Sequence, residues 1–199
     1  FALSACQPTN QLANQSPQPV TDEGLRAELW EDYLYDAIGD IGNFDFASPE
    51  ESPSMLPFVH YTLNRMVGEG LLSVSDQQVV LPPLEIMKEQ LVRYFNTDWA
   101  LTAAAYADLY EHYSGNPAQG TLYLHPTPVS YAESKDWDYR LGEVTFDEAH
   151  GLYQAQVEHI ANADTGRVDL IRQYVLGQRE NGELYFISQQ WQYPPLSDG

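Results

Sequence analysis

The chain has 199 residues, of which 43% are hydrophobic, so one domain with an ordinary core is expected. Its 29 acidic and 9 basic residues give a formal charge of −20, which opposes binding to nucleic acids or to an anionic membrane surface. The sequence has no apolar run long enough to span a bilayer. Its single cysteine excludes an internal disulfide framework and a thiolate cluster for zinc or iron–sulfur.

The first six residues form a candidate lipidation motif. Small side chains stand directly before Cys6, and signal peptidases need small residues beside the bond that they cleave. The motif Leu3-Ser4-Ala5-Cys6 resembles the lipobox of bacterial lipoproteins. The resemblance implies that residues 1–6 are the end of a signal segment in an incomplete precursor, and that acylated Cys6 anchors the protein in the lipid bilayer on its extracytoplasmic side. The alternative is a chance cysteine near a frayed terminus.

Residues 7–20 have the composition of a linker. They carry no charge and contain three prolines among Gln, Asn and Ser residues. Such a segment buries too little apolar surface to offset the entropy of ordering it. We therefore expect a disordered spacer between Cys6 and the folded domain.

A single α+β domain is expected over residues 21–193, followed by a tail over 194–199. Apolar residues recur at helical spacing through residues 22–113, which predicts a helical part with three to four helices. Thr21 is the expected cap of the first helix, Ser52-Pro53 opens the second and Pro82-Pro83 leads into the third. A fourth helix is expected over 102–113.

Residues 120–193 are strand-rich and are predicted to form an antiparallel sheet of four to five strands, with the helices packed on one face. Asn181-Gly182 predicts a tight hairpin with a type I′ turn. Beta-branched and aromatic residues mark the three clearest strands and two weaker ones. The three are 152–160, 167–176 and 183–192, and the weaker two are 121–124 and 140–146.

Two further segments extend the resemblance beyond the lipobox. With residues 91–96 (LVRYFN) and 182–188 (GELYFIS), the chain resembles uncharacterised lipobox-bearing lipoproteins of Gram-positive anaerobic bacteria. That group carries no assigned activity, so the resemblance implies a cell-envelope location and an architecture but no chemistry. The closing hairpin also resembles the curved sheets of cystatin-type and NTF2-type folds, which is an analogy of fold alone.

No local motif for catalysis, a metal or a cofactor is present. The chain lacks a nucleophile elbow, a zinc-protease helix, a Walker loop and a dinucleotide turn, and its five histidines are not at ligand spacing. Asp40, Asn43 and Asp45 offer oxygen ligands for calcium in the acidic stretch 22–51, but the order of ligands in an EF-hand is absent. A solvated acidic face is the simpler interpretation, so no catalytic residue, metal or cofactor is assigned.

The aromatic residues give the best functional indication. Trp137 lies in a highly charged segment between two weak strands, where a surface loop is expected, with Tyr131 and Tyr139 nearby. Exposed aromatic rings stack on sugars or anchor protein partners. These residues predict a non-catalytic surface lipoprotein that binds an envelope glycan or a protein partner. The alternatives are a hydrolase whose carboxylate site is assembled from distant segments, and a structural protein of envelope assembly.

Overall fold

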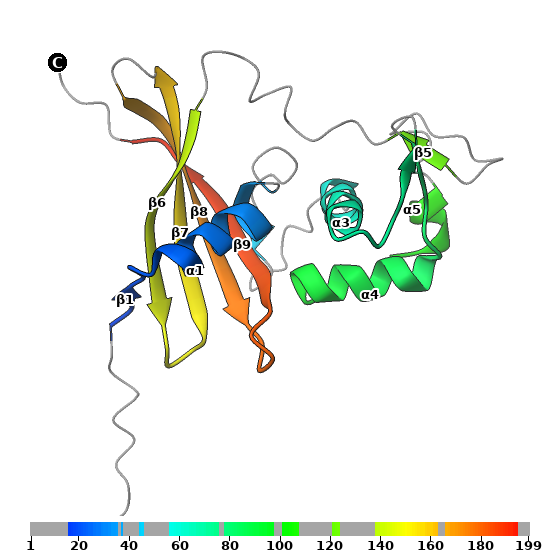
Figure 1. Cartoon of the computed structure of the whole chain (residues 1–199), viewed down its shortest axis with the longest axis horizontal. Helices are drawn as coiled ribbons and strands as arrows, with labels where there is room; N and C mark the ends of the chain where they lie inside the picture. Colours follow the sequence, from blue (N-terminus) through cyan, green and yellow to red (C-terminus); the bar gives the residue numbers. More distant parts are fainter. Residues whose placement is uncertain are drawn as a thin grey trace, which may run out of the picture.

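The computed structural model describes residues 16–35, 37, 44–45, 56–75, 78–97, 101–107, 121–123, 138–162 and 166–194. Within this part of the chain the fold is α+β, with a six-stranded antiparallel sheet beside a group of helices (Figure 1). The strands of this sheet follow the order β1-β6-β7-β8-β9-β2. Their bounds are β1 Gln18–Pro19, β2 Phe44–Asp45, β6 Asp138–Asp147, β7 Leu152–Asn162, β8 Arg167–Gln178 and β9 Leu184–Gln192.

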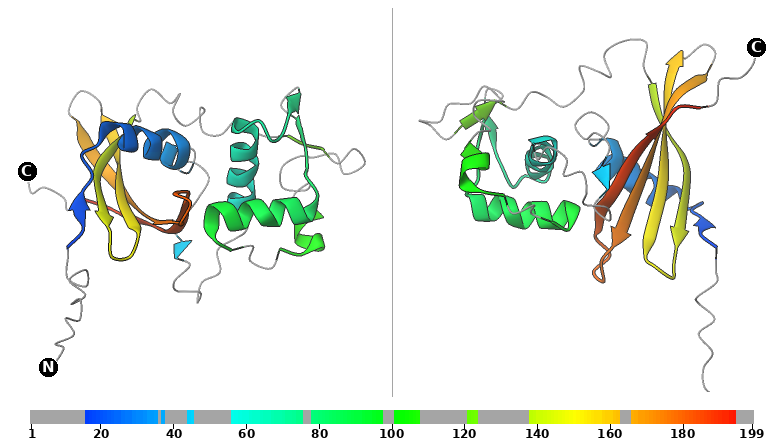
Figure 2. Two further views of the ribbon diagram at one scale, coloured as in Figure 1. Left: turned by 60° about the horizontal axis from the view of Figure 1, so that its bottom comes forward. Right: turned by 180° about the vertical axis from the view of Figure 1, so that it is seen from behind.

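The first helical segment lies across one face of the sheet. It comprises α1 (Glu23–Leu29) and the π-helical turn η2 (Trp30–Leu34), and Leu29 and Leu34 are completely buried. Alternate residues of β7, among them Ala155 and Val157, face this helix and are also buried. No described helix covers the opposite face of the sheet, which is turned to the viewer in the right-hand panel of Figure 2.

A helical pair forms the second part of the fold and contacts β9. The pair consists of α3 (Leu56–Gly68) and α4 (Leu84–Phe95), and the short helix α5 (Ala103–Ala107) follows it. Phe95 packs edge-to-face on Phe58 of α3 and stacks on Phe186 of β9, with centroid distances of 5.0 and 5.7 Å. Tyr61 also contacts Phe186, at 5.5 Å. These buried rings join the helical pair to the sheet in one core.

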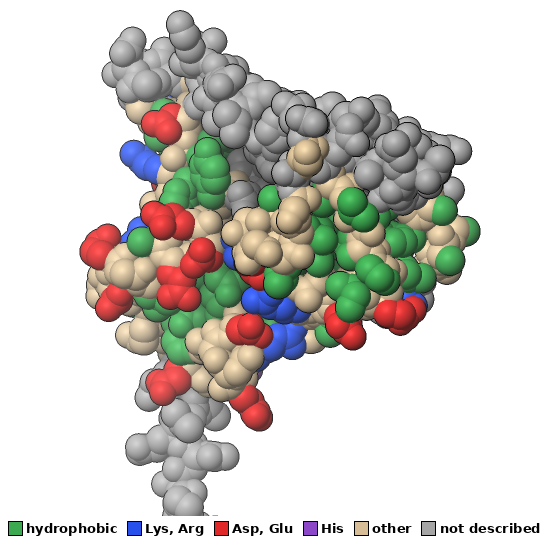
Figure 3. All heavy atoms as spheres, turned by 45° about the vertical axis from the view of Figure 1, so that its right-hand side comes forward, with side chains coloured by type: hydrophobic (Ala, Val, Ile, Leu, Met, Phe, Trp, Pro, Cys, Tyr) green, Lys and Arg blue, Asp and Glu red, His purple; other side chains and the backbone are tan. Residues whose placement is uncertain are grey.

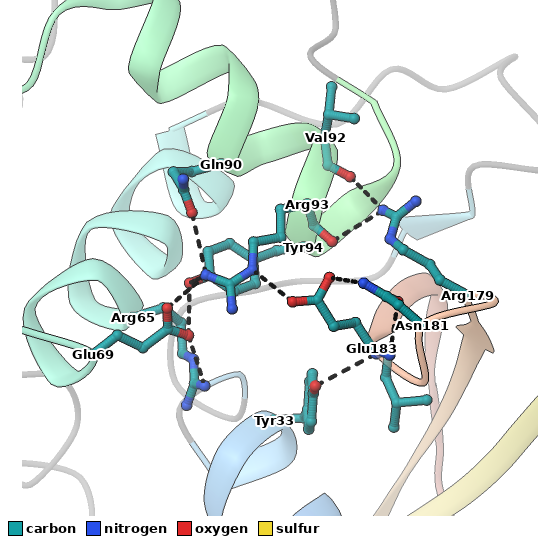
Figure 4. Close-up of polar contacts among 11 residues, drawn as sticks. Tyr33, Arg65, Glu69, Gln90, Val92, Arg93, Tyr94, Arg179, Asn181 and Glu183 are labelled. Atoms are coloured by element: carbon teal, nitrogen blue, oxygen red, sulfur yellow. Dashed lines mark hydrogen bonds and ion pairs between the residues drawn. The ribbon is translucent and has the colours of Figure 1, made fainter. Parts of the chain in front are cut away.

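A polar network closes the same junction at the surface (Figure 4). The Glu69 carboxylate accepts hydrogen bonds from Arg93 at 2.6 Å and from the Tyr94 hydroxyl at 2.9 Å, and it pairs with Arg65 at 3.3 Å. Arg93 also lies 3.5 Å from Glu183, just before β9. On the face shown in Figure 3, basic side chains gather between the sheet and the helical pair. We call Arg65, Glu69, Arg93, Tyr94 and Glu183 the junction network.

Arg179 caps the C-terminus of α4 from the neighbouring hairpin. Its guanidinium donates to the carbonyl oxygens of Val92 and Arg93, at 2.7 and 3.1 Å, and to the Asn96 side chain at 3.1 Å. Asn96 ends the helix in the left-handed conformation, with φ of 56°. The last carbonyls of a helix lack donors from a further turn. The Val92 carbonyl oxygen also accepts from the Asn96 N–H at 2.9 Å, so Arg179 adds a second donor there and supplies one to the Arg93 carbonyl oxygen.

The strand arrangement differs from the expectation of one sheet with four to five strands. Thr121–Tyr123 (β5) does not join the large sheet but pairs with β4 (Gln78–Val80), which pairs with β3 (Val74–Ser75). The two additional strands of the large sheet, β1 and β2, come from segments without a strand signal. The expectation of a disordered linker is therefore wrong at Gln18–Pro19, which pair with β6 as the edge strand β1. Proline is tolerated in this strand because its missing N–H can face away from the sheet at an edge. Residues 7–15 lie outside the described part.

The β8–β9 hairpin is confirmed, but its turn is not type I′. Gly182 donates from its backbone N–H to Arg179 O at 2.9 Å and has φ of 89°, whereas Asn181 is not among the described residues with positive φ. This is a three-residue loop with a glycine bulge rather than a two-residue turn. At the first helix, Asp22 rather than Thr21 supplies the cap, since its carboxylate accepts from Leu25 N at 2.9 Å.

Candidate ligand-binding site

Of the predicted lipidation and ligand-binding residues, only Tyr139 lies in the described part of the chain. Cys6, Tyr131 and Trp137 lie outside the described residues. Tyr139 is half-buried near the start of β6, and its ring stacks on His159 of β7 with a centroid distance of 4.7 Å. The structure therefore places Tyr139 on the sheet itself, against a histidine that the sequence did not mark.

The Tyr139–His159 contact belongs to a group of four side chains that lie on the face of the sheet that carries α1. Tyr139 stands opposite His159, and Arg172 of β8 stands opposite Trp191 of β9. The Arg172 guanidinium lies over the Trp191 ring, 5.0 Å from its centroid. Trp191 is 41% exposed, so one side of the indole remains open to a ligand. We call Tyr139, His159, Asp169, Arg172 and Trp191 the aromatic end of the sheet.

A bulge in β8 brings the Asp169 carboxylate into the aromatic end. Leu170 pairs with His159 and Val168 pairs with Ile160, so Asp169 is an extra residue between them. Its carboxylate lies 3.1 Å from Nδ1 of His159 and is one-third exposed. Asp169 thus touches both the buried imidazole and solvent.

Burial sets the charge of this histidine. Desolvation lowers the pKa of His159, the Arg172 charge lowers it further, and the Asp169 carboxylate partly opposes both. The imidazole is therefore neutral at neutral pH. Because the His159 side chain is only 4% exposed, it supports Tyr139 and orients Asp169 rather than meeting a substrate.

Tyr174 forms the floor beneath Arg172. Its side chain is completely buried, and burial raises the pKa of the Tyr174 hydroxyl to about 12, although Arg172 opposes the shift. The phenol stays protonated over the physiological range. The aromatic end therefore offers an exposed aromatic plane, a cation and a carboxylate above a neutral, rigid base.

Within the described ranges, no three His, Cys, Asp or Glu side chains are grouped to hold a metal ion. In the same ranges, no helix combines the length and apolarity needed to cross a membrane. Comparisons of the chain with protein-family models, curated proteins and solved structures found no match.

Proposed function

We propose that the protein is a non-catalytic, membrane-anchored surface lipoprotein that binds a neutral glycan of the cell envelope at the aromatic end. The half-exposed Trp191 ring, backed by Arg172, carries this proposal. Sugar rings present C–H faces that pack on an indole, and their hydroxyls pair with charged and amide groups. Arg172, which lies over the ring, supplies hydrogen-bond donors, and Asp169, beside His159 in the aromatic end, supplies acceptors.

The charge of the chain supports a neutral ligand. A formal charge of −20 repels anionic polymers at long range. At the aromatic end, Asp169 offsets the Arg172 charge, so no surplus of positive charge attracts an acid. A neutral oligosaccharide is not repelled by the negative charge of the chain and does not require a positive site. It gains most of its binding energy from packing on the aromatic plane.

The position of β1 supports an anchored arrangement. Gln18 pairs with Phe146 at one end of β6, whereas Tyr139 lies seven residues away toward the other end. At about 3.3 Å per residue this separation is roughly 23 Å along the strand. With Cys6 acylated, the anchored segment would join the sheet at the end remote from the aromatic end, so the point of attachment and the proposed binding site lie toward opposite ends of β6.

An array of immobilised oligosaccharides tests the binding function. We expect binding to neutral glycans that Trp191→Ala weakens about tenfold or more, as for a central aromatic contact. Tyr35→Ala is the matched control, because Tyr35 is 42% exposed but belongs to the helical segment. Equal binding by Trp191→Ala and the native protein contradicts the proposal, as does capture of protein partners with no glycan bound.

The anchor has a separate test. Native protein from cell envelopes is expected to carry a diacylglycerol group on Cys6 by mass spectrometry and to fractionate with membranes. Cys6→Ser is expected to release it without changing glycan binding by the purified domain. An unmodified Cys6 in the native protein contradicts the anchor but leaves the glycan site standing.

A further inference from the structure

A separate groove lies on the opposite face of the sheet from α1. It has a volume of about 280 Å³. This is close to the lower end of the range for ligand pockets, about 300–1,000 Å³, and suits a molecule with one ring. Its polar lining comes from three strands and consists of Glu143, Thr145, Gln154, Gln156 and Gln173. We call it the amide groove.

Strand register gathers the three glutamines. Gln154 and Gln156 are two residues apart on β7 and therefore point to the same face. Gln173 of β8 stands directly opposite Gln156 and accepts a hydrogen bond from Gln192 at 3.1 Å, which orients its carboxamide. The groove thus presents several groups that both donate and accept hydrogen bonds, as sugar hydroxyls require.

A bulge in β6 adds one carboxylate. Leu141 pairs with Val157 and Val144 pairs with Ala155, so two residues, Gly142 and Glu143, stand opposite Gln156. Arg26 of α1 donates to the Gly142 carbonyl oxygen at 2.8 Å and holds the bulge from the edge of the sheet. The bulge thereby directs Glu143 into the groove.

Glu143 is the single charged residue in the lining described for this groove. Two cations near this bulge have partners of their own: Arg26 donates to the carbonyl oxygens of Gly142 and Val20, and Arg140 is paired with Glu158 at 2.5 Å. The charge of Glu143 is therefore available to a ligand that brings a cation. A carboxylate among amides matches a molecule with one ammonium group and several hydroxyls, since a charge-assisted hydrogen bond is stronger than a neutral one.

We propose that the amide groove is a second binding site and that it takes an amino sugar with a free amine. Glu143 receives the ammonium group, and the glutamine carboxamides and Thr145 receive the ring hydroxyls. The amide groove lies on the opposite face of the sheet from the aromatic end. Its described lining has no exposed aromatic ring, and its ligand is a cation rather than a neutral glycan.

Titration of isotope-labelled protein by NMR tests the inference with glucosamine, glucose and glucuronate at about pH 6, where an amine is protonated. We expect glucosamine to bind about tenfold more tightly than glucose and glucuronate to bind most weakly. The side-chain amide signals of Gln154, Gln156 and Gln173 should move on binding.

Two charge-matched variants complete the experiment. Glu143→Gln should bring glucosamine to within about twofold of glucose, whereas Glu148→Gln, at an exposed position in the β6–β7 turn, should leave the preference unchanged. Equal affinities for glucose and glucosamine in the native protein overturn the inference, and so does an unchanged preference in Glu143→Gln. Trp191→Ala should bind glucosamine normally, so failure of this site and failure of the aromatic end are distinguishable.

Discussion

Replacing Glu69 with glutamine removes the charge at the centre of the junction network and keeps its shape. Glu69 contacts Arg93 at 2.6 Å, the Tyr94 hydroxyl at 2.9 Å and Arg65 at 3.3 Å, and its side chain is 25% exposed. A charge-assisted hydrogen bond contributes about 1.5–3 kcal/mol when buried, and partial exposure lowers each contribution here to about 0.5–1 kcal/mol. Glu69→Gln is therefore expected to lower the free energy of unfolding by about 2 kcal/mol and Tm by about 4–8 °C.

The pH dependence of this loss is the sharper test. Burial alone would raise the pKa of the Glu69 carboxyl, but hydrogen bonds from Arg93 and Tyr94 and the charges of Arg93 and Arg65 lower it below its usual 4.5. Because the folded pKa is lower than the unfolded one, the stabilisation is complete above about pH 4.5 and is lost as the pH falls through the folded value.

Urea denaturation at neutral pH and at successively lower pH measures this difference. The free-energy gap between native protein and Glu69→Gln should shrink toward zero in acid. By contrast, Glu85→Gln, which removes the ion pair between the highly exposed Glu85 and Lys88, should change stability by less than about 0.5 kcal/mol throughout. A gap that stays constant from neutral to acid pH would refute the assigned role of the Glu69 charge.

Three further outcomes are expected in the same denaturation assay. Arg179→Met should cost about 1–2 kcal/mol, because it removes the side-chain donor from the Arg93 carbonyl oxygen and leaves the Val92 carbonyl oxygen with the Asn96 N–H alone, and an unchanged midpoint would show that water replaces the cap. Gly182→Ala should cost about 1–2 kcal/mol, because its φ of 89° is strained for a residue with a Cβ; no loss would contradict the glycine-bulge turn. The folded pKa of Tyr174 is raised to about 12, so native protein should lose stability as the pH rises from about 10 to 12, and Tyr174→Phe should lose less.

The long elements were predictable because local periodicity determines them. Met87, Leu91 and Phe95 lie at helical spacing in the sequence and are all buried in α4. Likewise, the strand patterns after residue 138 correspond to β6–β9. In both cases the spacing of apolar residues indicates which side of the helix or strand is buried, whichever element packs against that side.

The aromatic end was not predictable because it depends on register and bulges. Trp191 and Arg172 are 19 residues apart in the chain and meet only through the pairing of β8 with β9. Asp169 reaches His159 because one residue is inserted in β8, and the alternation of side chains does not reveal that insertion. Similarly, β1 and β2 have two residues each, too few for a periodic signal.

The most direct test of glycan binding at the aromatic end is the indole NMR spectrum of the labelled protein during titration with neutral tri- and tetrasaccharides. The chain has four tryptophans, and Trp30, which is half-buried in the helical segment, supplies an internal reference. We predict a saturable shift of the Trp191 indole signal with at least one neutral oligosaccharide, while the Trp30 signal stays in place. A Trp191 signal unmoved by every neutral oligosaccharide, in protein shown to be folded, would contradict the account.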